Sequence, residues 1–197
     1  LNGEFDSSFP FGGTPTGLSV MNAQFKPVTT RHKTQLGFVL GLTEVMTRNW
    51  LMALNYSYDS QKGYQTDPYR MISVVDQISG EPTSTLYESR PEQRKSQSLF
   101  WDNKFAFGPT VTELSYRYFA DNWGISSHTL EASERINLDK SWYIEPNARF
   151  YHQNAANFYR AFLIGNAALP AFASSDTRLS RFDATTYGAK IGLRVSG

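Results

Sequence analysis

The chain has 197 residues, a formal net charge of +1 and an aromatic content of 15%. Its balanced charge gives no electrostatic reason to expect nucleic acid or another strongly anionic partner, and the absence of cysteine excludes disulfides and cysteine-bound metals. A mean hydropathy of -0.44 and the lack of any run of about twenty apolar residues exclude a transmembrane helix, but not a membrane barrel, whose strands are apolar only at every second position.

The beginning of the chain differs from the rest. Residues 1–32 are rich in glycine, proline, serine and threonine, which predicts a loop-rich N-terminal segment with one weak alternating piece at residues 18–26. Within residues 33–197, apolar and polar residues alternate in several long stretches, and a period of two predicts β-strands with two different faces. The chain therefore divides into an N-terminal segment and a strand-rich domain.

Two strands and a long polar loop open this domain. The first strand covers residues 33–43 and the second residues 50–59, with a short turn at residues 47–49 between them. One face of this pair is apolar and carries Leu36, Phe38, Leu40, Leu42, Trp50, Met52, Leu54, Tyr56 and Tyr58. Residues 61–94 follow without a clean period, which predicts a long surface loop.

Short connections join the next three strands. Residues 99–107 and 113–120 alternate on either side of a turn at residues 108–109, and residues 130–136 follow a further short connection. Their apolar faces include Trp101, Phe105, Leu114, Tyr116, Tyr118 and Leu130, opposite faces with Asp102, Glu113, Arg117, Glu131 and Arg135. Glu134 falls on the apolar face, which a membrane strand tolerates only near an interface.

The stretch from Trp142 to Gln153, W-Y-I-E-P-N-A-R-F-Y-H-Q, has the clearest pattern in the chain. It is about twice as long as an ordinary strand, and aromatic residues stand at both of its ends. A transmembrane β-strand has this pattern, with its rings at the two membrane interfaces, although a long strand of a soluble sandwich would also fit. Residues 154–184 then predict a second long loop, and residues 187–195 a final strand.

The connections between the strands sort by length. If the turns at residues 47–49, 108–109 and 139–141 lie on one side, both long loops lie on the other. Bacterial outer-membrane barrels have short periplasmic turns and longer extracellular loops. The expected fold is therefore all-β: a transmembrane antiparallel up-and-down β-barrel, with about seven strands in this chain as part of a larger barrel. Because the chain starts without methionine and ends directly after an alternating strand, we expect further strands at one or both ends.

Three motifs carry a resemblance to a known family. They are T-P-T-G at residues 14–17, Y-E-S-R-P-E-Q-R at residues 87–94 and R-F-Y-H-Q-N-A-A-N-F-Y at residues 149–159, and the last two are the more specific. With them the chain resembles a family of bacterial outer-membrane β-barrel proteins known mainly as a domain of unknown function. The resemblance implies a fold and a location in the bacterial outer membrane, and it transfers no catalytic, cofactor-binding or metal-binding residues.

The sequence predicts no enzyme and no metal site. His32, His128 and His152 are far apart in the sequence, and none has a second ligand at a metal spacing such as H-x-x-x-H. Ser126 and His128 share a strand face and would suit a lipid-hydrolysing site on the outer barrel wall, but no orienting Asn or Asp is evident and Ser127 points to the opposite face. Polar residues at the barrel rim are the preferred interpretation.

The two long loops hold the remaining candidates for binding. Oxygen ligands for a divalent cation are present in the first loop, but their spacing is not that of an EF-hand and nearby cations favour a self-neutralising surface. The charged residues of this loop are Asp67, Asp76, Glu81, Glu88 and Glu92, with Arg70, Arg90, Arg94 and Lys95. In the second loop, residues 161–173 are the most apolar part and would pack over the barrel mouth, dock a partner or fold into the lumen as a plug.

These features favour a structural or anchoring barrel of the bacterial outer membrane. Its expected partners are the lipid bilayer and other outer-membrane or surface proteins, contacted through residues 61–94 and 154–184. The alternative is a passive pore or transporter for small solutes, and a lipid-modifying enzyme is disfavoured because no triad is evident. The inward faces that would permit an open lumen carry Gly37, Gly41, Gly188 and Gly192.

Charge pairing predicts the register of four neighbouring strands. Opposite charges that face each other stabilise an antiparallel pair, and three registers that keep the apolar faces together produce two inward rows of alternating charge. The predicted rows are Asp102–Arg117–Glu131–Arg149 and Glu113–Arg135–Glu145. The residues predicted to face lipid on the opposite side include Leu54, Leu114, Ala148, Ile191 and Leu193.

Overall fold

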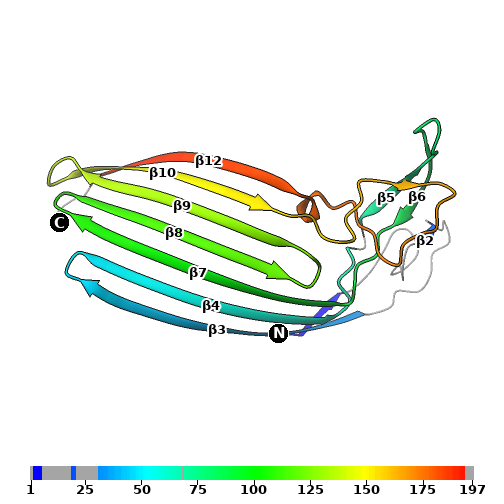
Figure 1. Cartoon of the computed structure of the whole chain (residues 1–197), viewed down its shortest axis with the longest axis horizontal. Helices are drawn as coiled ribbons and strands as arrows, with labels where there is room; N and C mark the ends of the chain where they lie inside the picture. Colours follow the sequence, from blue (N-terminus) through cyan, green and yellow to red (C-terminus); the bar gives the residue numbers. More distant parts are fainter. Residues whose placement is uncertain (1, 6–18, 21–30, 68, 194–197) are drawn as a thin grey trace.

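The structure is a computed structural model that describes residues 2–5, 19–20, 31–67 and 69–193. In this part of the chain the fold is all-β, with two sheets and one short 3-10 helix, η1 (Thr177–Leu179). The large sheet contains, in spatial order, β1 (Asn2–Phe5), β3 (Arg31–Thr47), β4 (Trp50–Gly63), β7 (Gln93–Phe107), β8 (Thr110–Asp121), β9 (Ser126–Asn137), β10 (Trp142–Gln153) and β12 (Phe182–Leu193). The small sheet contains β11 (Leu163–Ile164), β5 (Met71–Val75), β6 (Pro82–Tyr87) and β2 (Ser19–Val20), and lies beyond one end of the large sheet (Figure 1).

All seven long strands predicted from the alternation are present, and each pairs antiparallel with its neighbours. Several are longer than predicted: β4 continues to Gly63 and β7 already begins at Gln93. The first long segment therefore leaves the sheet at residue 64 and returns at residue 92. Among the described residues, no helix has the length and apolar character needed to cross a membrane.

Short strands also lie where the sequence predicted loop. Within residues 1–32, β1 pairs with β3 and β2 pairs with β6. The hairpin of β5 and β6 occupies the first long segment, and β11 of the second long segment adds to β5 in parallel. These strands have two to six residues each, too few for a period of two to be recognised. The motif T-P-T-G at residues 14–17 lies outside the described residues.

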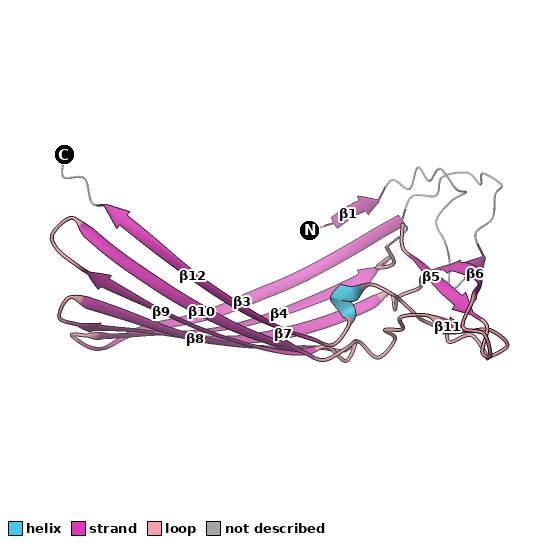
Figure 2. Ribbon diagram, turned by 90° about the horizontal axis from the view of Figure 1, so that it is seen from above, coloured by secondary structure: helices cyan, strands magenta, loops and turns pink. Residues whose placement is uncertain are grey.

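The large sheet is a single curved layer that does not close into a barrel within the described residues. Figure 2 shows it from above as a trough, with β3 along one side and β12 along the other. Among the described strands β12 pairs only with β10, and β1 covers only part of the opposite edge, next to β3. The sheet thus has a convex face, a concave face and two edges.

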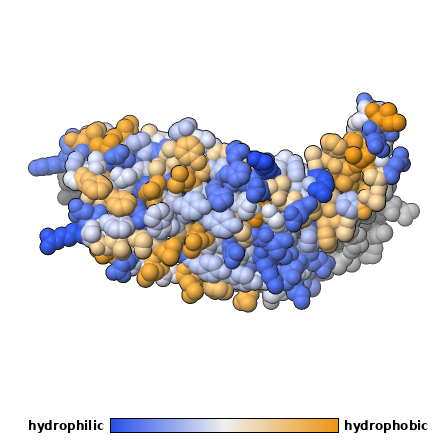
Figure 3. All heavy atoms as spheres, viewed as in Figure 1, coloured by the Kyte–Doolittle hydropathy of each residue, from blue (hydrophilic) through white to orange (hydrophobic). Residues whose placement is uncertain are grey.

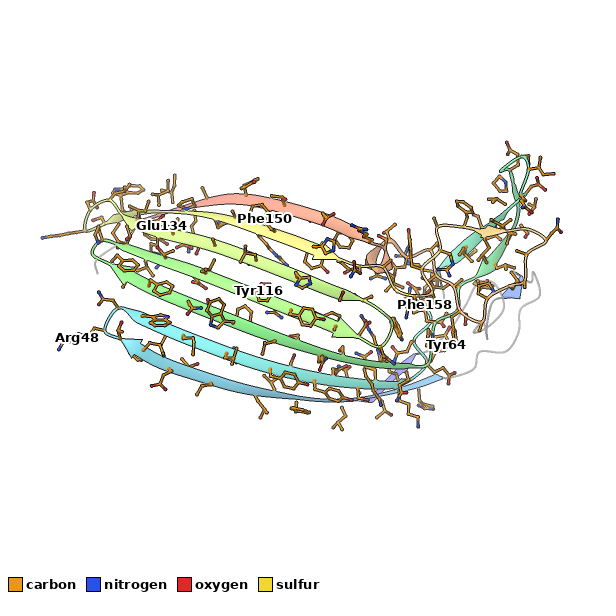
Figure 4. All side chains as sticks on the ribbon, in the orientation of Figure 1. Arg48, Tyr64, Tyr116, Glu134, Phe150 and Phe158 are labelled. Carbon is orange, nitrogen blue, oxygen red and sulfur yellow. The ribbon has the colours of Figure 1, made fainter. Side chains whose placement is uncertain are left out.

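The connections sort to two ends of the sheet as the loop lengths predicted. The turns after β3, β7 and β9 lie at one end, which we call the turn end, and Arg48 marks it in Figure 4. The connection around Trp123 and both long segments lie at the opposite end, where Tyr64 and Phe158 are labelled. We call residues 64–92 and 154–181, which gather there, the cap.

The two faces of the large sheet differ in character. Leu114, Tyr116 and their neighbours lie on the convex face, whereas Ser115 and Arg117 line a hollow on the concave face. Figure 3 shows the convex face, with hydrophobic residues spread over the strands and hydrophilic ones gathered toward the cap. Many large apolar side chains on this face are exposed, up to 73% for Leu36 and 69% for Ile191. Glu134 lies on the same face close to the turn end (Figure 4).

Buried apolar residues concentrate in the cap. One cluster joins the small sheet to the second long segment and contains Ile72, Val74, Leu86, Leu163 and Ala173. The other contains Trp123, Ile125, Ala156, Phe158 and Leu179, with Phe119 of β8 packed against it. No apolar side chain described on the long strands of the large sheet is buried. The sheet therefore has no hydrophobic core of its own in this part of the chain.

The register between β9 and β10 matches the charge-based prediction, but the registers on both sides of β8 do not. Arg149 faces Glu131 as predicted. Arg117, however, faces Phe100 on β7 and Thr129 on β9, two residues away from the predicted partners. The prediction that Arg117 lies between Asp102 and Glu131 is therefore wrong. A shift of two residues keeps each side chain on its predicted face.

Turn geometry explains the shift between β7 and β8. Phe107 faces Thr110, so the β7–β8 turn consists of Gly108 and Pro109, and Gly108 has a φ of 57°. The charge-based register would move the turn to Pro109 and Thr110, where proline cannot adopt the positive φ that a two-residue hairpin needs. In the β8–β9 turn, Gly124 has a φ of 89°. An exposed ion pair contributes only about 0–1 kcal/mol, so the Gly108-Pro109 turn dominates the register of β7 and β8.

Candidate functional site

The motif at residues 87–94 places two charged residues inside the cap. Glu88, from the motif at residues 87–94, is fully buried and accepts hydrogen bonds from the Asp67 backbone N–H and the Ser174 hydroxyl. Arg90 Nε lies 2.6 Å from Glu88 Oε1, and Arg90 Nη2 lies 3.0 Å from Asp176 Oδ2. A buried ionic network therefore ties the first long segment to the second.

Asp176 is the centre of this network. Its side chain is only 1% exposed and receives the Arg178 guanidinium, with Nη2 at 2.7 Å from Oδ2. It also caps η1 by accepting the Arg178 backbone N–H. Burial opposes ionisation, but the hydrogen bonds from Arg178 and the charges of Arg178 and Arg70 outweigh it, so the pKa of Asp176 lies well below its usual range.

Polar contacts also fix the cap to the large sheet. Gln153, at the end of β10, donates to the carbonyls of Arg178 and Ser180, both at 2.8 Å. The Asn157 backbone N–H of the cap donates to the Trp123 carbonyl at 2.8 Å, and the Trp123 indole in turn donates to the Gln93 carbonyl at the start of β7, at 2.9 Å. The cap is therefore held in a defined position at the end of the sheet.

Between the cap and the concave face lies a hollow of about 740 Å³. The strands contribute charged residues and aromatic rings, and the cap contributes a charged edge. From the strands come Phe100, Arg117, Phe119, Glu131, Arg149 and Tyr151, and from the cap Arg90, Asp176, Arg178 and Leu179. A volume of this size matches the range of about 300–1,000 Å³ that small-molecule sites have. We regard the hollow as the candidate site.

A second charged group lies on the concave face closer to the turn end. Lys104 Nζ is 3.1 Å from Glu113 Oε2, and Arg135 Nη2 is 2.6 Å from Glu145 Oε2. The Arg135 guanidinium also lies 4.7 Å from the ring centre of Tyr143. Within each pair the opposite charges neutralise one another.

The histidines that seemed separate in the sequence are partly brought together. His128 and His152 face each other across β9 and β10 on the convex face. Tyr116 Oη lies 2.6 Å from His128 Nδ1, and His152 Nδ1 lies 2.5 Å from Asp183 Oδ1. His32 lies on β3, toward the opposite edge of the large sheet. Among the described residues no three histidine, aspartate or glutamate side chains are grouped as ligands for a metal.

Ser126 and Ser127 point to opposite faces, as the strand period requires. Ser126 accepts a hydrogen bond from the Asn154 side chain at 2.8 Å, on the same face as His128. Ser127 is buried and lines the hollow. The sequence did not reveal the polar partners Asn154, which directly follows β10, and Asp183, which lies on β12; Asn154 contacts Ser126, whereas Asp183 contacts His152.

The acidic residues of the first long segment have separate roles. Asp76 accepts the backbone N–H groups of Ser79 and Ile78 in the hairpin turn, and these bonds, with that from the Ser79 hydroxyl, lower its pKa. Asp67 lies 3.5 Å from Arg70, and Glu88 pairs with Arg90. Glu81 and Glu92 take part in backbone bonds to Asp76 and Gly63. The arrangement favours local neutralisation over a shared cation.

The apolar segment at residues 161–173 packs only in part. Leu163 and Ala173 are buried in the cluster beside the small sheet. Its remaining large apolar residues are about half exposed and border a groove of about 580 Å³: Phe162, Ile164, Leu169 and, nearby, Phe172. The segment therefore both fills the cap and leaves an apolar surface on it.

The sequence did not identify Asp176 and Arg178 as central residues. Both lie within a polar run, S-S-D-T-R at residues 174–178, that shows no period of two, and Arg90, a partner of Asp176, lies 86 residues away in the sequence. Only the local pattern of an aspartate ahead of a short helical turn could have indicated a capping role.

The fold and the hollow define an all-β protein built on an open antiparallel sheet with a capped end. This chain belongs to the family described as "Protein of unknown function (DUF3570)", whose model matches residues 4–197. The expected relationship to a family of unknown function is confirmed at that level. No curated protein and no solved structure matches the chain.

Proposed function

We propose that the large sheet is part of the wall of a β-barrel in a bacterial outer membrane, and that the protein has a structural or anchoring role there. One observation carries this proposal: the long strands present an apolar convex face with no covering layer among the described residues, while buried apolar clusters occur only in the cap and the adjoining turn. In water such a face would be a large exposed patch, whereas lipid would cover it.

The aromatic residues of the convex face support the membrane proposal. Near the turn end lie Trp50, Phe105, Phe107 and Trp142, and nearer the cap lie Tyr56, Tyr58, Tyr116 and Tyr118. Trp50 and Tyr58 are eight residues apart on β4, a distance of about 27 Å along the strand. With a strand tilt of about 40°, this corresponds to about 21 Å across the membrane, close to the apolar band of outer-membrane barrels.

The cap favours an anchoring role over a pore through which small solutes pass freely. Its ionic network and two apolar clusters hold it over one end of the concave face, and its exposed apolar groove offers a surface for another envelope protein. In the proposed orientation the cap faces outward and the short turns face the periplasm. The expected partners are therefore the bilayer and outer-membrane or surface proteins.

A passive pore or transporter for small solutes is the second candidate. It is favoured by the hollow of about 740 Å³, which lies on the polar concave face. Single-channel conductance of the full-length protein in a planar bilayer separates the two roles. A stable ohmic conductance supports the pore, and silence at saturating protein supports the anchor.

Tryptophan fluorescence tests the membrane proposal. Two variants of the full-length protein would each keep one tryptophan, with the others replaced by phenylalanine: Trp101 on the convex face, which is 38% exposed, or Trp123, which is buried against the cap. In vesicles of brominated phospholipid, the bromine atoms should quench Trp101 strongly and Trp123 little. If Trp101 is quenched no more than Trp123, the convex face does not contact lipid and the proposal fails.

A further inference from the structure

The observed register leaves two arginines on the concave face without a carboxylate in ion-pair contact. Arg117 lies with its guanidinium 4.8 Å from the ring centre of Phe100. Arg149 has Glu131 and Thr186 as its cross-strand neighbours. Neither arginine takes part in the ion pairs found within 4.0 Å among the described residues. Both line the hollow beneath the cap.

The other arginines of the hollow are neutralised. Arg94 pairs with Asp121 at 2.7 Å, Arg90 with Glu88 and Asp176, and Arg178 with Asp176. Of the lining side chains without such a partner, Lys33, Arg117 and Arg149 are cationic and Glu131 alone is anionic. The hollow therefore carries an excess of positive charge that the neighbouring wall does not share.

We propose that this hollow binds a small organic anion that carries a phosphate or carboxylate group. Arg117 and Arg149 hold the anionic group, since a guanidinium presents paired N–H donors to two oxygens. Phe100 keeps the Arg117 guanidinium stacked and oriented, and Phe119 and Tyr151 contact the body of the ligand. This site does not depend on whether the barrel anchors a partner.

The shape of the hollow favours a small solute over a macromolecule. It lies on the concave side, and residues of the cap form one of its walls. Glu131 lies among its charged residues and opposes an anion, so its removal should strengthen binding. Neutralising an arginine should therefore lower the affinity for the anion, and neutralising Glu131 should raise it.

Calorimetry on the folded full-length protein in detergent tests the site. The probes are phenyl phosphate, inorganic phosphate and benzyl alcohol, a neutral analogue with a similar ring. Phenyl phosphate should bind more tightly than inorganic phosphate, and benzyl alcohol should not bind. Arg117→Gln and Arg149→Gln should each weaken the binding of phenyl phosphate about tenfold or more, as expected for the loss of a charge-assisted hydrogen bond.

Two further variants make the result specific. Arg48→Gln removes the same charge at the turn end and should leave the affinity unchanged (Figure 4). Glu131→Gln should bind phenyl phosphate severalfold more tightly, a gain that misfolding cannot produce. The proposal is overturned if phenyl phosphate does not bind, if benzyl alcohol binds equally well, or if Arg48→Gln weakens binding as much as Arg117→Gln.

Discussion

Individual buried charged side chains stabilise the cap. Asp176→Asn should destabilise the cap by about 3–5 kcal/mol, because it removes one partner from a buried network and leaves Arg90 without part of its compensation. Asp183→Asn is the matched control, since Asp183 is 74% exposed and its loss should cost about 0–1 kcal/mol. Hydrogen exchange of the cap amides measures the loss of cap stability in both variants. Equal protection in the two variants would contradict the central role of Asp176.

The contribution of Asp176 should also depend on pH. Its pKa is lower in the folded protein than the usual value of about 3.9 in an unfolded chain, so its stabilising effect is complete above that value. The effect is lost as the pH falls through the folded pKa. The difference in cap stability between wild type and Asp176→Asn should therefore be constant from pH 7 to pH 5 and shrink below about pH 4. A constant difference at all pH values would argue against an ionised Asp176.

The packing of Tyr143 against Gly192 can also be tested by single substitutions. They face each other on β10 and β12, and the Tyr143 ring occupies the space that a Cβ on Gly192 would fill. Gly192→Ala should therefore destabilise the sheet by about 1–3 kcal/mol through overpacking. Combined with Tyr143→Ala, the same change should cost much less, which a double-mutant cycle of thermal unfolding would detect. Additive effects would show that the ring does not set the requirement for glycine.

At the scale of elements, cross-linking tests the registers on both sides of β8. Ser115 faces Glu131 across β8 and β9, whereas Arg117 is two residues out of line with it. Cysteines at positions 115 and 131 should form a disulfide under mild oxidation, and cysteines at 117 and 131 should not. The chain has no native cysteine, so mass spectrometry reads the result without background. Efficient cross-linking of the second pair alone would restore the charge-based register.

The strands could be predicted from the sequence because each has a long period of two. Trp142 to Gln153 was identified with its observed bounds. The register between β7 and β8 was predicted incorrectly because charge pairing is weaker than the conformational demands of the Gly108-Pro109 turn. Because the shift is two residues, each side chain still lies on its predicted face, and Arg117 lies on the concave side as predicted.

The candidate site was less accessible to sequence reasoning. Asp176 and Arg90 contact each other across 86 residues, and the strands of the small sheet are too short to show a pattern. The free guanidinium of Arg117 could not be foreseen, because the predicted register assigned it two acidic neighbours. Only the pattern of inward-facing charges indicated that the concave face would matter.

A further prediction for the long strands concerns their two faces. Leu114→Arg would place a charge on the convex face of β8 and should cost about 2–4 kcal/mol if that position lies near the middle of the membrane. Ser115→Arg, one residue along on the concave face, should have little effect. Unfolding titrations in lipid vesicles measure both free energies. Equal costs would contradict a lipid-facing convex surface.

At the scale of the whole molecule, the sorting of the connections predicts a fixed orientation in the membrane. Gly80 lies in the β5–β6 hairpin of the cap, and Lys140 lies in the β9–β10 turn at the opposite end. On intact cells, Gly80→Cys should react with a membrane-impermeant maleimide and Lys140→Cys should not. Labelling of both after outer-membrane permeabilisation is the control. Equal labelling before permeabilisation would contradict the proposed orientation.

The contrast between the short turns and the cap has a consequence for the order of folding. Most neighbouring strands of the large sheet are also neighbours in the sequence, so hairpins such as β7–β8 and β9–β10 require only short loops to close. The contacts of Glu88 and Arg90 with Ser174 and Asp176 join residues 86 apart and require both long segments to be in place. We therefore expect the sheet to assemble hairpin by hairpin and the cap to close as a late step, after the last strands have paired.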